Sequence, residues 1–302
     1  MRFLVLGSVN IDMTYSLDHI VSPGETTTAC SLQTGAGGKG ANQAAALGKA
    51  GSDVFFAGKA GEDGRWVLDK LSGYGVDVSL TVVSPSVMTG QAMIQLDRNG
   101  QNSIILSPGG NRSFTESEIE SILSGFGKGD AVILQNEVNH LSFMIEKARE
   151  RGMTVCLNPS PYDSIIETLP LDEVDMFFVN EIEAGELAGL SARPRTDEEF
   201  RKAAEVLMER FPSASFVITA GRHGAYYAKG GESWFSPIVD LPAVDTTGAG
   251  DTFSGYFLAS LYGGLSPKEA LDKASRASAL TVSRSGAMDS MPTMEEVEAL
   301  EA

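Results

Sequence analysis

Short apolar runs typical of β-strands alternate with helical runs along most of the chain, and this alternation limits the folds that the chain can adopt. These runs follow one another at residues 3–6, 41–49, 54–57, 66–73, 131–134, 141–151, 154–157, 176–179, 181–188, 198–210 and 216–219. A further run at 225–228 is expected to add an antiparallel strand. The pattern predicts an α/β fold in which helices cover both faces of a mainly parallel sheet. Ligands of such sheets bind beyond the carboxyl ends of the strands.

Two segments, about 11–34 and 88–107, interrupt the alternation. The first has no helical period, and the second contains two β-like runs joined by Asn99-Gly100, which is a strong hairpin signal. We expect both segments to form a small β-sheet lid within a single domain that spans residues 1–302. A small sheet with one apolar face must cover that face with a substrate, a second subunit, or both.

The composition is that of an ordinary soluble globular protein: 42% of the residues are hydrophobic and 21% are charged. A net charge of −17 argues against a general binder of nucleic acids or anionic membranes. The first apolar run is too short for a signal peptide, and no run approaches the roughly 18 apolar residues of a membrane span. Cys30 and Cys156 are too few for a disulfide framework or a structural zinc site. A cytoplasmic location is therefore expected.

The segment Asp-Thr-Thr-Gly-Ala-Gly-Asp-Thr-Phe at 245–253 marks the start of a mostly apolar helical run. Gly248 and Gly250 permit close approach of a ligand to the backbone, and the free amides of a helix start favour an anion. Asp251 is then a carboxylate at a site suited to a phosphate. It is either a helix cap or a base that acts beside a phosphoryl group.

A second glycine-rich segment, residues 35–44, precedes an alanine-rich helical run. It is not a P-loop, because Lys39 is followed by Gly40 rather than by serine or threonine. It also lacks the strand and the spacing of a dinucleotide-binding G-x-G-x-x-G motif. The segment is either a turn that feeds a helix or a site where Lys39 and Asn42 hold a neutral polyhydroxyl ligand.

Together the two glycine-rich segments resemble the N-terminal and C-terminal signatures of the ribokinase (PfkB-type) family of carbohydrate and nucleoside kinases. Further matches to the family follow in order at 7–12, 23–26, 58–63, 158–161, 180–183 and 219–224. The resemblance extends over essentially the whole chain. It implies a ribokinase-like three-layer α/β/α sandwich with a mainly parallel central sheet and a small β-sheet lid.

Within this family the chain is most similar to the ribokinases, which implies transfer of the γ-phosphoryl group of ATP to a primary hydroxyl of a pentose, D-ribose in the first place. The resemblance assigns Asp251 as general base and the amides of Gly248, Ala249, Gly250 and Asp251 as an anion hole. The positions that match sugar contacts are Asn10, Asp12, Gly38, Lys39, Asn42, Glu137 and Asp251. Without the resemblance, Asp12 would be interpreted as a turn residue and Glu137 as a solvated loop end.

The resemblance also implies sites for ATP and two cations. The residues expected to bind ATP are Asn180, Thr219, Gly221, Gly224, Gly248, Gly250 and Ser275, although a serine at 275 offers little stacking area. Mg²⁺ is expected to enter with ATP, with Asn180 and Glu183 in its water shell. Those two residues also fit a helix N-cap with a capping box, and both interpretations can hold together. A potassium ion is expected beside the anion hole, at Asp245, Thr247, Ser283, Gly286 and Ala287.

The resemblance implies a homodimer formed through the lid, and no partnership with nucleic acid or membrane. Two alternatives within the class remain, a kinase for another small sugar such as deoxyribose or a fructose-type sugar, and a nucleoside kinase. An alternative of another class is a non-catalytic sugar-binding regulatory protein, against which the presence of Asp251, Asn180 and Glu183 argues. A nicotinamide-dependent dehydrogenase is excluded by the missing G-x-G-x-x-G after the first strand.

Overall fold

The central sheet has eight strands, in the order β14-β13-β12-β11-β10-β9-β1-β4, in a computed structural model that describes residues 1–300. The strands from β12 to β4 are parallel, and β13 and β14 extend the sheet antiparallel. Their bounds are β1 Phe3–Leu6, β4 Val54–Ala57, β9 Ala131–Gln135, β10 Thr154–Asn158, β11 Met176–Asn180, β12 Ser215–Thr219, β13 Ala225–Lys229 and β14 Glu232–Ser236. The predicted mainly parallel α/β sheet is therefore confirmed.

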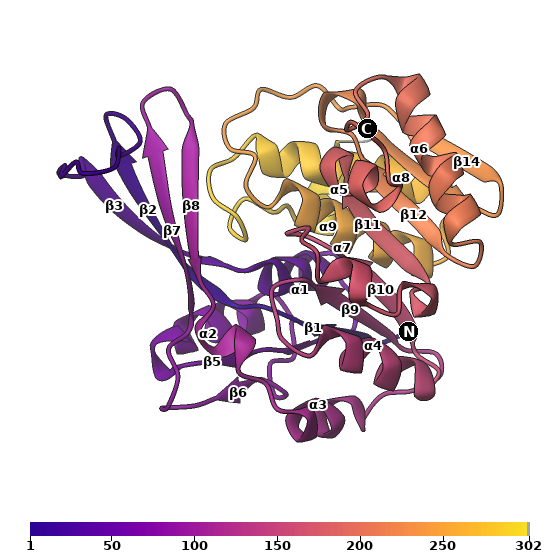
Figure 1. Cartoon of the computed structure of the whole chain (residues 1–302), viewed down its shortest axis with the longest axis horizontal. Coiled ribbons are helices and arrows are strands. Elements are labelled where there is room, and N and C mark those ends of the chain that lie inside the picture. Colours follow the sequence, from indigo (N-terminus) through magenta and orange to yellow (C-terminus); the bar gives the residue numbers. More distant parts are fainter. Residues whose placement is uncertain (301–302) are drawn as a thin grey trace.

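Helices cover both faces of this sheet, as the alternation of runs predicts (Figure 1). Their bounds are α1 Lys39–Lys49, α2 Arg65–Gly73, α3 Glu116–Leu123, α4 Leu141–Glu150, α5 Glu181–Leu187, α6 Asp197–Arg210, α7 Ala249–Tyr262, α8 Pro267–Val282 and α9 Met294–Ala299. None of these helices in residues 1–300 combines the length and the apolar character that crossing a membrane requires.

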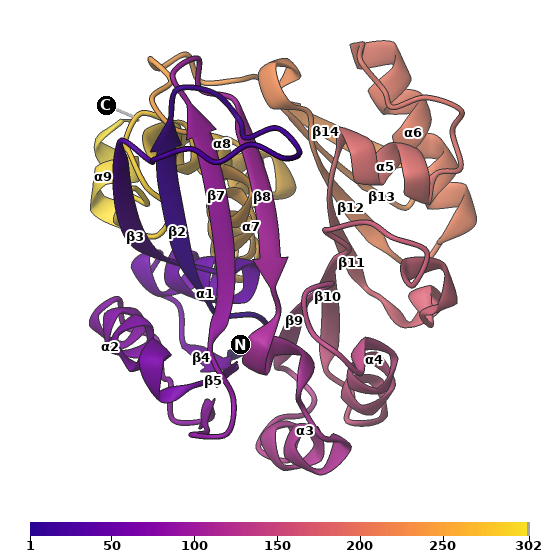
Figure 2. The same ribbon diagram turned by 60° about the vertical axis from the view of Figure 1, so that its left-hand side comes forward.

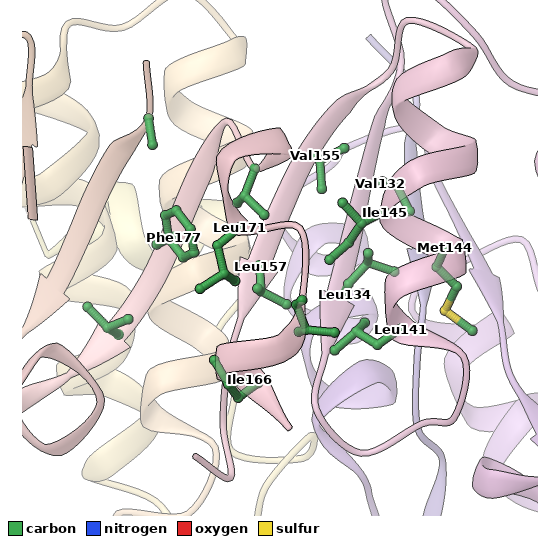
Figure 3. Packing of buried hydrophobic residues seen from close by; sticks show 14 of the residues in the cluster. Val132, Leu134, Leu141, Met144, Ile145, Val155, Leu157, Ile166, Leu171 and Phe177 are labelled. Carbon is green, nitrogen blue, oxygen red and sulfur yellow. The ribbon is translucent and has the colours of Figure 1, made fainter. Parts of the chain in front are cut away.

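Two hydrophobic cores lie on opposite faces of the sheet, because successive side chains of a strand point to opposite sides. In β1, Leu4 and Leu6 pack into the core beneath α3 to α6, whereas Phe3 and Val5 pack into the core beneath α1, α2, α7 and α8. Figure 3 shows part of the first core, where residues of α4 such as Leu141 lie against strands β9 and β10. The cores fix the helices of both layers against the sheet and thereby position the ends of those helices.

The helices begin in two different ways. Capping boxes, in which the N-cap side chain and a glutamate three residues later satisfy each other's backbone amides, start α3, α5, α6, α8 and α9. In contrast, α1 and α7 begin at Gly38 (φ 92°) and Gly248 (φ 77°), with no side-chain cap. Most of the amides at the start of α7 thus remain accessible to other groups, whereas those of Lys39, Gly40 and Ala41 in α1 donate to Glu137 and Ser8.

A second sheet of four strands stands apart from the first, in the order β3-β2-β7-β8 (Figures 1 and 2). Its strands are β2 Asn10–Leu17, β3 Ser31–Gly37, β7 Gly90–Asp97 and β8 Asn102–Ser107. The predicted small sheet and its turn at Asn99-Gly100 are confirmed, and Gly100 has a φ of 78°. We call this sheet the lid.

The boundaries of the lid differ from the predicted ones in two respects. Strand β2 begins at Asn10, ahead of the predicted segment, and residues 18–30 lie outside the strands. The residues from Gly35 to Gly37 belong to β3 rather than to a turn, and a β-carbon on Gly37 would lie 2.1 Å from Oδ2 of Asp12. Gly37 therefore permits β3 to pass directly beside the Asp12 carboxylate.

Several features of the fold were not predicted, among them helices α3, α8 and α9, which lie outside the predicted runs. Strand β14 forms a hairpin with β13 through Gly230 and Gly231, and its sequence, in which Trp234 and Phe235 are adjacent, does not alternate as a strand pattern would. Strands β5 (Lys59–Ala60) and β6 (Val82–Val83) form a separate two-stranded sheet. They are too short for a period of two to be recognised.

Candidate active site

The starts of α1 and α7 meet at the carboxylate of Asp251. Oδ2 of Asp251 accepts a hydrogen bond from Nδ2 of Asn42 at 3.0 Å, and Oδ1 accepts one from Nε2 of Gln43 at 3.0 Å. Only 7% of Asp251 is exposed. The two predicted residues, Asn42 and Asp251, are therefore brought together, and Gln43, for which the sequence predicted no role, joins them.

Asn42 has one polar atom left for a ligand. Its Nδ2 is bound to Asp251, while its buried Oδ1 has no partner among the described residues. An unpaired buried carbonyl costs stability unless a donor reaches it. Asn42 therefore presents an acceptor, suited to a ligand hydroxyl, beside the carboxylate of Asp251.

The backbone at the start of α7 provides amides for an anion. The amides of Gly248, Gly250 and Asp251 donate to none of the residues that the structure describes, whereas the Ala249 amide donates to the Thr246 carbonyl at 3.3 Å. Three of the four predicted amides are thus open, and that of Ala249 is partly engaged. The partial positive charge of the helix start adds to their attraction for an anion.

Three carboxylates surround Lys39 at the start of α1. Burial, together with the negative charges of Glu137 and Asp251, raises the pKa of Asp12 to about 7. Burial alone would lower the pKa of Lys39, but the charges of Asp251, Glu137 and Glu183 outweigh it and raise that pKa. Lys39 therefore keeps its positive charge among the carboxylates.

Glu137 follows β9 and is tied to α1 rather than solvated. Its Oε2 accepts hydrogen bonds from the Ser8 hydroxyl and from the Lys39 amide, the latter at 3.2 Å. Ser8 in turn accepts one from the Gly40 amide at 3.2 Å. The second oxygen of Glu137 is left for a ligand, and the interpretation as a solvated loop end is wrong.

Asn10, at the base of the lid, is oriented by Asn111 of the short helical turn η2 (Gly109–Arg112). Nδ2 of Asn111 donates to Oδ1 of Asn10 at 2.7 Å and to the Val9 carbonyl at 3.2 Å, and its Oδ1 accepts from the Val9 amide at 3.0 Å. The carbonyl of Asn10 is therefore occupied, and its Nδ2 is the atom available to a ligand. Asn111 lies about a hundred residues from Asn10, and no sequence motif marked it.

A cavity of about 730 Å³ begins at Lys39 and Asp251 and extends along the carboxyl ends of β11 and β12. All the residues predicted to bind ATP line it: Asn180, Thr219, Gly221, Gly224, Gly248, Gly250 and Ser275. Its far part has an apolar wall that the sequence analysis missed, formed by Ile238, Val239, Leu241, Ala279 and Val282. The hydroxyl of Ser275 donates to Oγ of Ser236 at 3.1 Å, within the protein.

Asn180 and Glu183 form the capping box of α5. The Glu183 carboxylate accepts from the backbone amide of Asn180 at 2.8 Å and from its Nδ2 at 3.0 Å, and the carbonyl oxygen of the Asn180 side chain accepts from the amides of Ile182 and Glu183. No cluster of three histidine, cysteine or acidic residues within residues 1–300 could enclose a metal ion. The pair thus fits Mg²⁺ only through water molecules, since each carboxylate oxygen has a remaining lone pair.

Asp245 joins two loops at the place predicted for potassium. Oδ1 accepts from the amide and hydroxyl of Thr247 at 2.9 and 2.7 Å, and Oδ2 accepts from the Gly286 amide at 3.0 Å. Partial burial opposes ionisation, but these hydrogen bonds outweigh it and hold the pKa of Asp245 below its ordinary value.

The carbonyls near Asp245 differ in their availability to a cation. Those of Thr247, Ser283 and Gly286 accept no hydrogen bond from the described part of the chain, so they could face a cation. The Ala287 carbonyl already accepts from the amide and hydroxyl of Ser290, at 3.2 and 2.7 Å. Ala287 is therefore the least suited of the predicted potassium ligands.

Comparison with known proteins agrees with this arrangement. Residues 2–294 match the family described as pfkB family carbohydrate kinase. The chain is 33% identical over 297 residues to the ribokinase of Haemophilus influenzae, covering 97% of this chain and 95% of that protein.

Solved ribokinases share the fold. The ribokinase of Cryptococcus neoformans in complex with ADP is 34% identical, with a TM-score of 0.87 over 99% of this chain and 98% of that chain. The ribokinase of Arabidopsis thaliana complexed with ribose and ATP is 31% identical, with a TM-score of 0.86 over 99% of this chain and 98% of that chain. The likeness covers both the central sheet and the lid, as the ribokinase-like fold predicted from the sequence requires. The chain therefore belongs to the pfkB family of carbohydrate kinases.

Proposed function

We propose that this protein transfers the γ-phosphoryl group of ATP to a primary hydroxyl of a pentose, and that D-ribose is the substrate and ribose 5-phosphate the product. The observation that carries the proposal is the position of Asp251. This carboxylate lies between a cluster of hydrogen-bond acceptors at the base of the lid and a cavity lined by open helix amides. The similar proteins named above include a ribokinase complexed with ribose and ATP.

The polar atoms around Asp251 suit a neutral sugar. Asp12, the free oxygen of Glu137 and Oδ1 of Asn42 accept hydrogen bonds, and Lys39 and Nδ2 of Asn10 donate them. Acceptors outnumber donors, so a ligand with several hydroxyl groups is favoured, and hydrogen bonds to ionised acceptors are the stronger ones. The carboxylates would repel a sugar acid or a sugar phosphate.

Phosphoryl transfer then depends mainly on positioning and charge. Asp251 accepts the proton of the attacking hydroxyl, and the amides of Gly248, Gly250 and Asp251 stabilise the negative charge on the phosphoryl oxygens. ATP occupies the cavity of about 730 Å³, with its base against the apolar wall near Ile238 and Ala279. The phosphates thereby point toward Asp251.

Cations assist at two places. Asn180 and Glu183 would hold the water shell of a Mg²⁺ ion that enters with ATP, and the ion would offset phosphate charge. Asp245 and the carbonyls of Thr247, Ser283 and Gly286 would hold a potassium ion. Such an ion would rigidify the backbone that precedes the anion hole, because residues 245–247 lie directly before Gly248.

The whole chain acts as a single kinase domain with the lid as its moving part. Closure of the lid over the sugar excludes water that would otherwise hydrolyse ATP. The lid carries large exposed apolar side chains, Leu32, Ile104, Ile105 and Leu106, which a second copy of the chain would cover in a homodimer. Light scattering of the wild type should give the mass of two chains, and Ile105→Asp should reduce it to one.

A coupled assay of ADP release over pentoses, hexoses and nucleosides tests the proposed function. The highest kcat/KM is expected with D-ribose. Higher values for deoxyribose or a fructose-type sugar would replace the substrate and keep the mechanism. A preference for nucleosides would replace the substrate class, and the absence of turnover with every acceptor would refute the kinase activity.

A further inference from the structure

We infer that Gln43 is a positioning residue for Asp251 and that Gln135 fixes Gln43 in the orientation this requires. The inference rests on the proposed function, in which Asp251 is the general base. It concerns two amide side chains that lie behind the base, on the side away from the cavity lining. We call the three side chains Gln135, Gln43 and Asp251 the amide relay.

The amide relay is buried throughout. Nε2 of Gln135 donates to Oε1 of Gln43 at 2.8 Å, and Nε2 of Gln43 donates to Oδ1 of Asp251 at 3.0 Å. Gln43 is 1% exposed and Gln135 is 0% exposed. A β-carbon on Gly7 would lie 2.0 Å from Oε1 of Gln135, so the Gln135 amide fits only because residue 7 has no side chain. The relay therefore joins the end of β9 to α1 and α7.

The direction of the relay is set by charge. An ionised Asp251 accepts hydrogen bonds only, so Gln43 must present its NH₂ group to it and turn its carbonyl away. The bond from Gln135 holds that carbonyl and opposes rotation of the amide by half a turn. If the Gln43 amide were rotated, its carbonyl oxygen would face the Asp251 carboxylate, and the repulsion between them would displace the carboxylate.

Gln43 differs in this respect from Asn42, the other donor to Asp251. Asn42 keeps its carbonyl for a ligand, whereas both ends of the Gln43 amide are bound within the relay. Gln43 itself does not line the cavity, and it acts through Asp251, which does. Its neutral amide aims the base without the opposite charge that an ion pair would place beside it.

The relay also carries an unpaired atom. Oε1 of Gln135 is buried and has no hydrogen-bond partner in the described residues. An apolar side chain of similar size at 135 would avoid the loss of stability that such an atom causes. A glutamine there is better explained by its donor bond to Gln43 than by packing.

The first test is Gln43→Met, which keeps the length of the side chain and removes the donor. We expect kcat with the best sugar to fall about 10- to 100-fold, as for a misplaced catalytic group, with KM and the calorimetric Kd of the sugar within about threefold of wild type. An unchanged kcat overturns the inference, and so does a loss confined to KM.

Gln43→Glu provides a readout that a structural role would not move. It keeps the shape and sets a second carboxyl group against Asp251, and the two share a proton until a higher pH. The acid limb of the kcat profile should therefore move upward by about one pH unit or more. If the acid limb of the kcat profile of Gln43→Glu stays at the wild-type pH, the inference is overturned, even where Gln43→Met does not fold.

Gln135→Leu and the double variant Gln43→Met with Gln135→Leu test whether the two glutamines act together. The single change should lower kcat, and adding it to Gln43→Met should lower kcat no further, because Gln135 acts through Gln43. The control is Leu207→Ala, which removes a buried core side chain of α6. It should lower the melting temperature and leave the dependence of kcat on pH unchanged. Multiplicative effects of the two glutamine changes overturn the relay. Failure of the wild type to phosphorylate any sugar refutes the proposed function instead.

Discussion

Gly255 of α7 lies directly against Ala46 of α1: a β-carbon on Gly255 would come within 2.5 Å of the Ala46 β-carbon and 3.0 Å of the Leu47 amide nitrogen. This contact is one helical turn beyond the pair formed by Asp251 and Asn42, since both residues of the contact follow that pair by four positions. The close approach of the two helices is what lets the short side chains of Asn42 and Asp251 meet. The packing of α1 against α7 thus determines the position of the proposed base.

Gly255→Ala should separate α1 from α7. We expect a loss of about 1–3 kcal/mol in the free energy of unfolding, because the added methyl group meets backbone and Cβ atoms in a packed interface. We also expect a lower kcat, since Asn42 and Gln43 would no longer reach Asp251 together. Denaturant unfolding and steady-state kinetics measure the two effects. Gly73→Ala, at the end of α2 with nothing within 4 Å of the added carbon, is the matched control and should change neither.

Asp251→Asn removes the proposed base and leaves the volume nearly unchanged. We expect kcat to fall by about 10²- to 10⁴-fold, the usual contribution of a general base. Sugar binding should persist, because Asp12, Glu137 and Asn10 still offer their hydrogen bonds. Calorimetry of sugar binding beside the turnover assay separates the two effects. Turnover close to that of the wild type would show that another group accepts the proton.

Asp12 should make sugar binding depend on pH. Its pKa is raised from 3.8 to about 7 by burial and by the charges of Glu137 and Asp251. Sugar hydroxyls donate to the ionised form, so the association constant should rise about tenfold between pH 6 and pH 8 as Asp12 loses its proton. Calorimetric titrations at several pH values measure this rise. Asp12→Asn should abolish it, and an equal rise in that variant would assign it to another group.

The raised pKa of Asp12 also affects the stability of the fold, which should fall with rising pH while sugar binding strengthens. Between pH 3.8 and about 7 the folded protein retains a proton on Asp12 that the unfolded chain has lost. Raising the pH through this range therefore lowers the stability of the sugar-free protein. The contribution should vanish in Asp12→Asn, and the difference between the two unfolding curves against pH measures it.

The sequence predicts the parts of this molecule that depend on local pattern. The order of most strands and helices follows from periodicity, although α3, α8 and α9 were not predicted, and the hairpin at Asn99-Gly100 follows from turn chemistry. Asp251 and Asn42 could be assigned because they stand in motifs. Gln43 stands in the same motif as Asn42, yet its role depends on Gln135, which ends strand β9 and reaches Gln43 past Gly7.

The parts that could not be predicted arise from tertiary packing. The bond between Asn111 and Asn10 joins η2 to the first residue of β2 at the base of the lid, and no local signal connects them. The raised pKa of Asp12 depends on burial and on two carboxylates, one in the loop after β9 and one in α7. An asparagine three residues before a glutamate predicted both the cap of α5 and a metal role, and the structure confirms the cap.

Glu183→Gln tests whether the cap of α5 also serves Mg²⁺. The change replaces one acceptor oxygen of the capping box by a donor, so we expect a loss of about 1 kcal/mol in the free energy of unfolding. The Mg²⁺ concentration that gives half of the maximal rate should rise several-fold, because the water shell loses a charged acceptor. Thr196 and Glu199 form a similar box at α6, so Glu199→Gln is the control for cap loss alone. An unchanged Mg²⁺ requirement in Glu183→Gln would show that Glu183 acts only in the cap of α5.

Potassium should raise turnover through the loops that Asp245 joins. The Asp245 carboxylate holds Thr247 by two hydrogen bonds and Gly286 by one, and three nearby carbonyls accept nothing from the described residues. A monovalent cation on these carbonyls would fix the backbone before Gly248 and so align the amides that stabilise the phosphoryl group. We expect kcat to be several-fold higher in potassium chloride than in choline chloride of equal ionic strength. In Asp245→Asn the response should be lost, because the remaining neutral oxygen binds a cation more weakly. Equal rates in both salts for the wild type would remove the cation from the mechanism and leave Asp245 as a link between the loops.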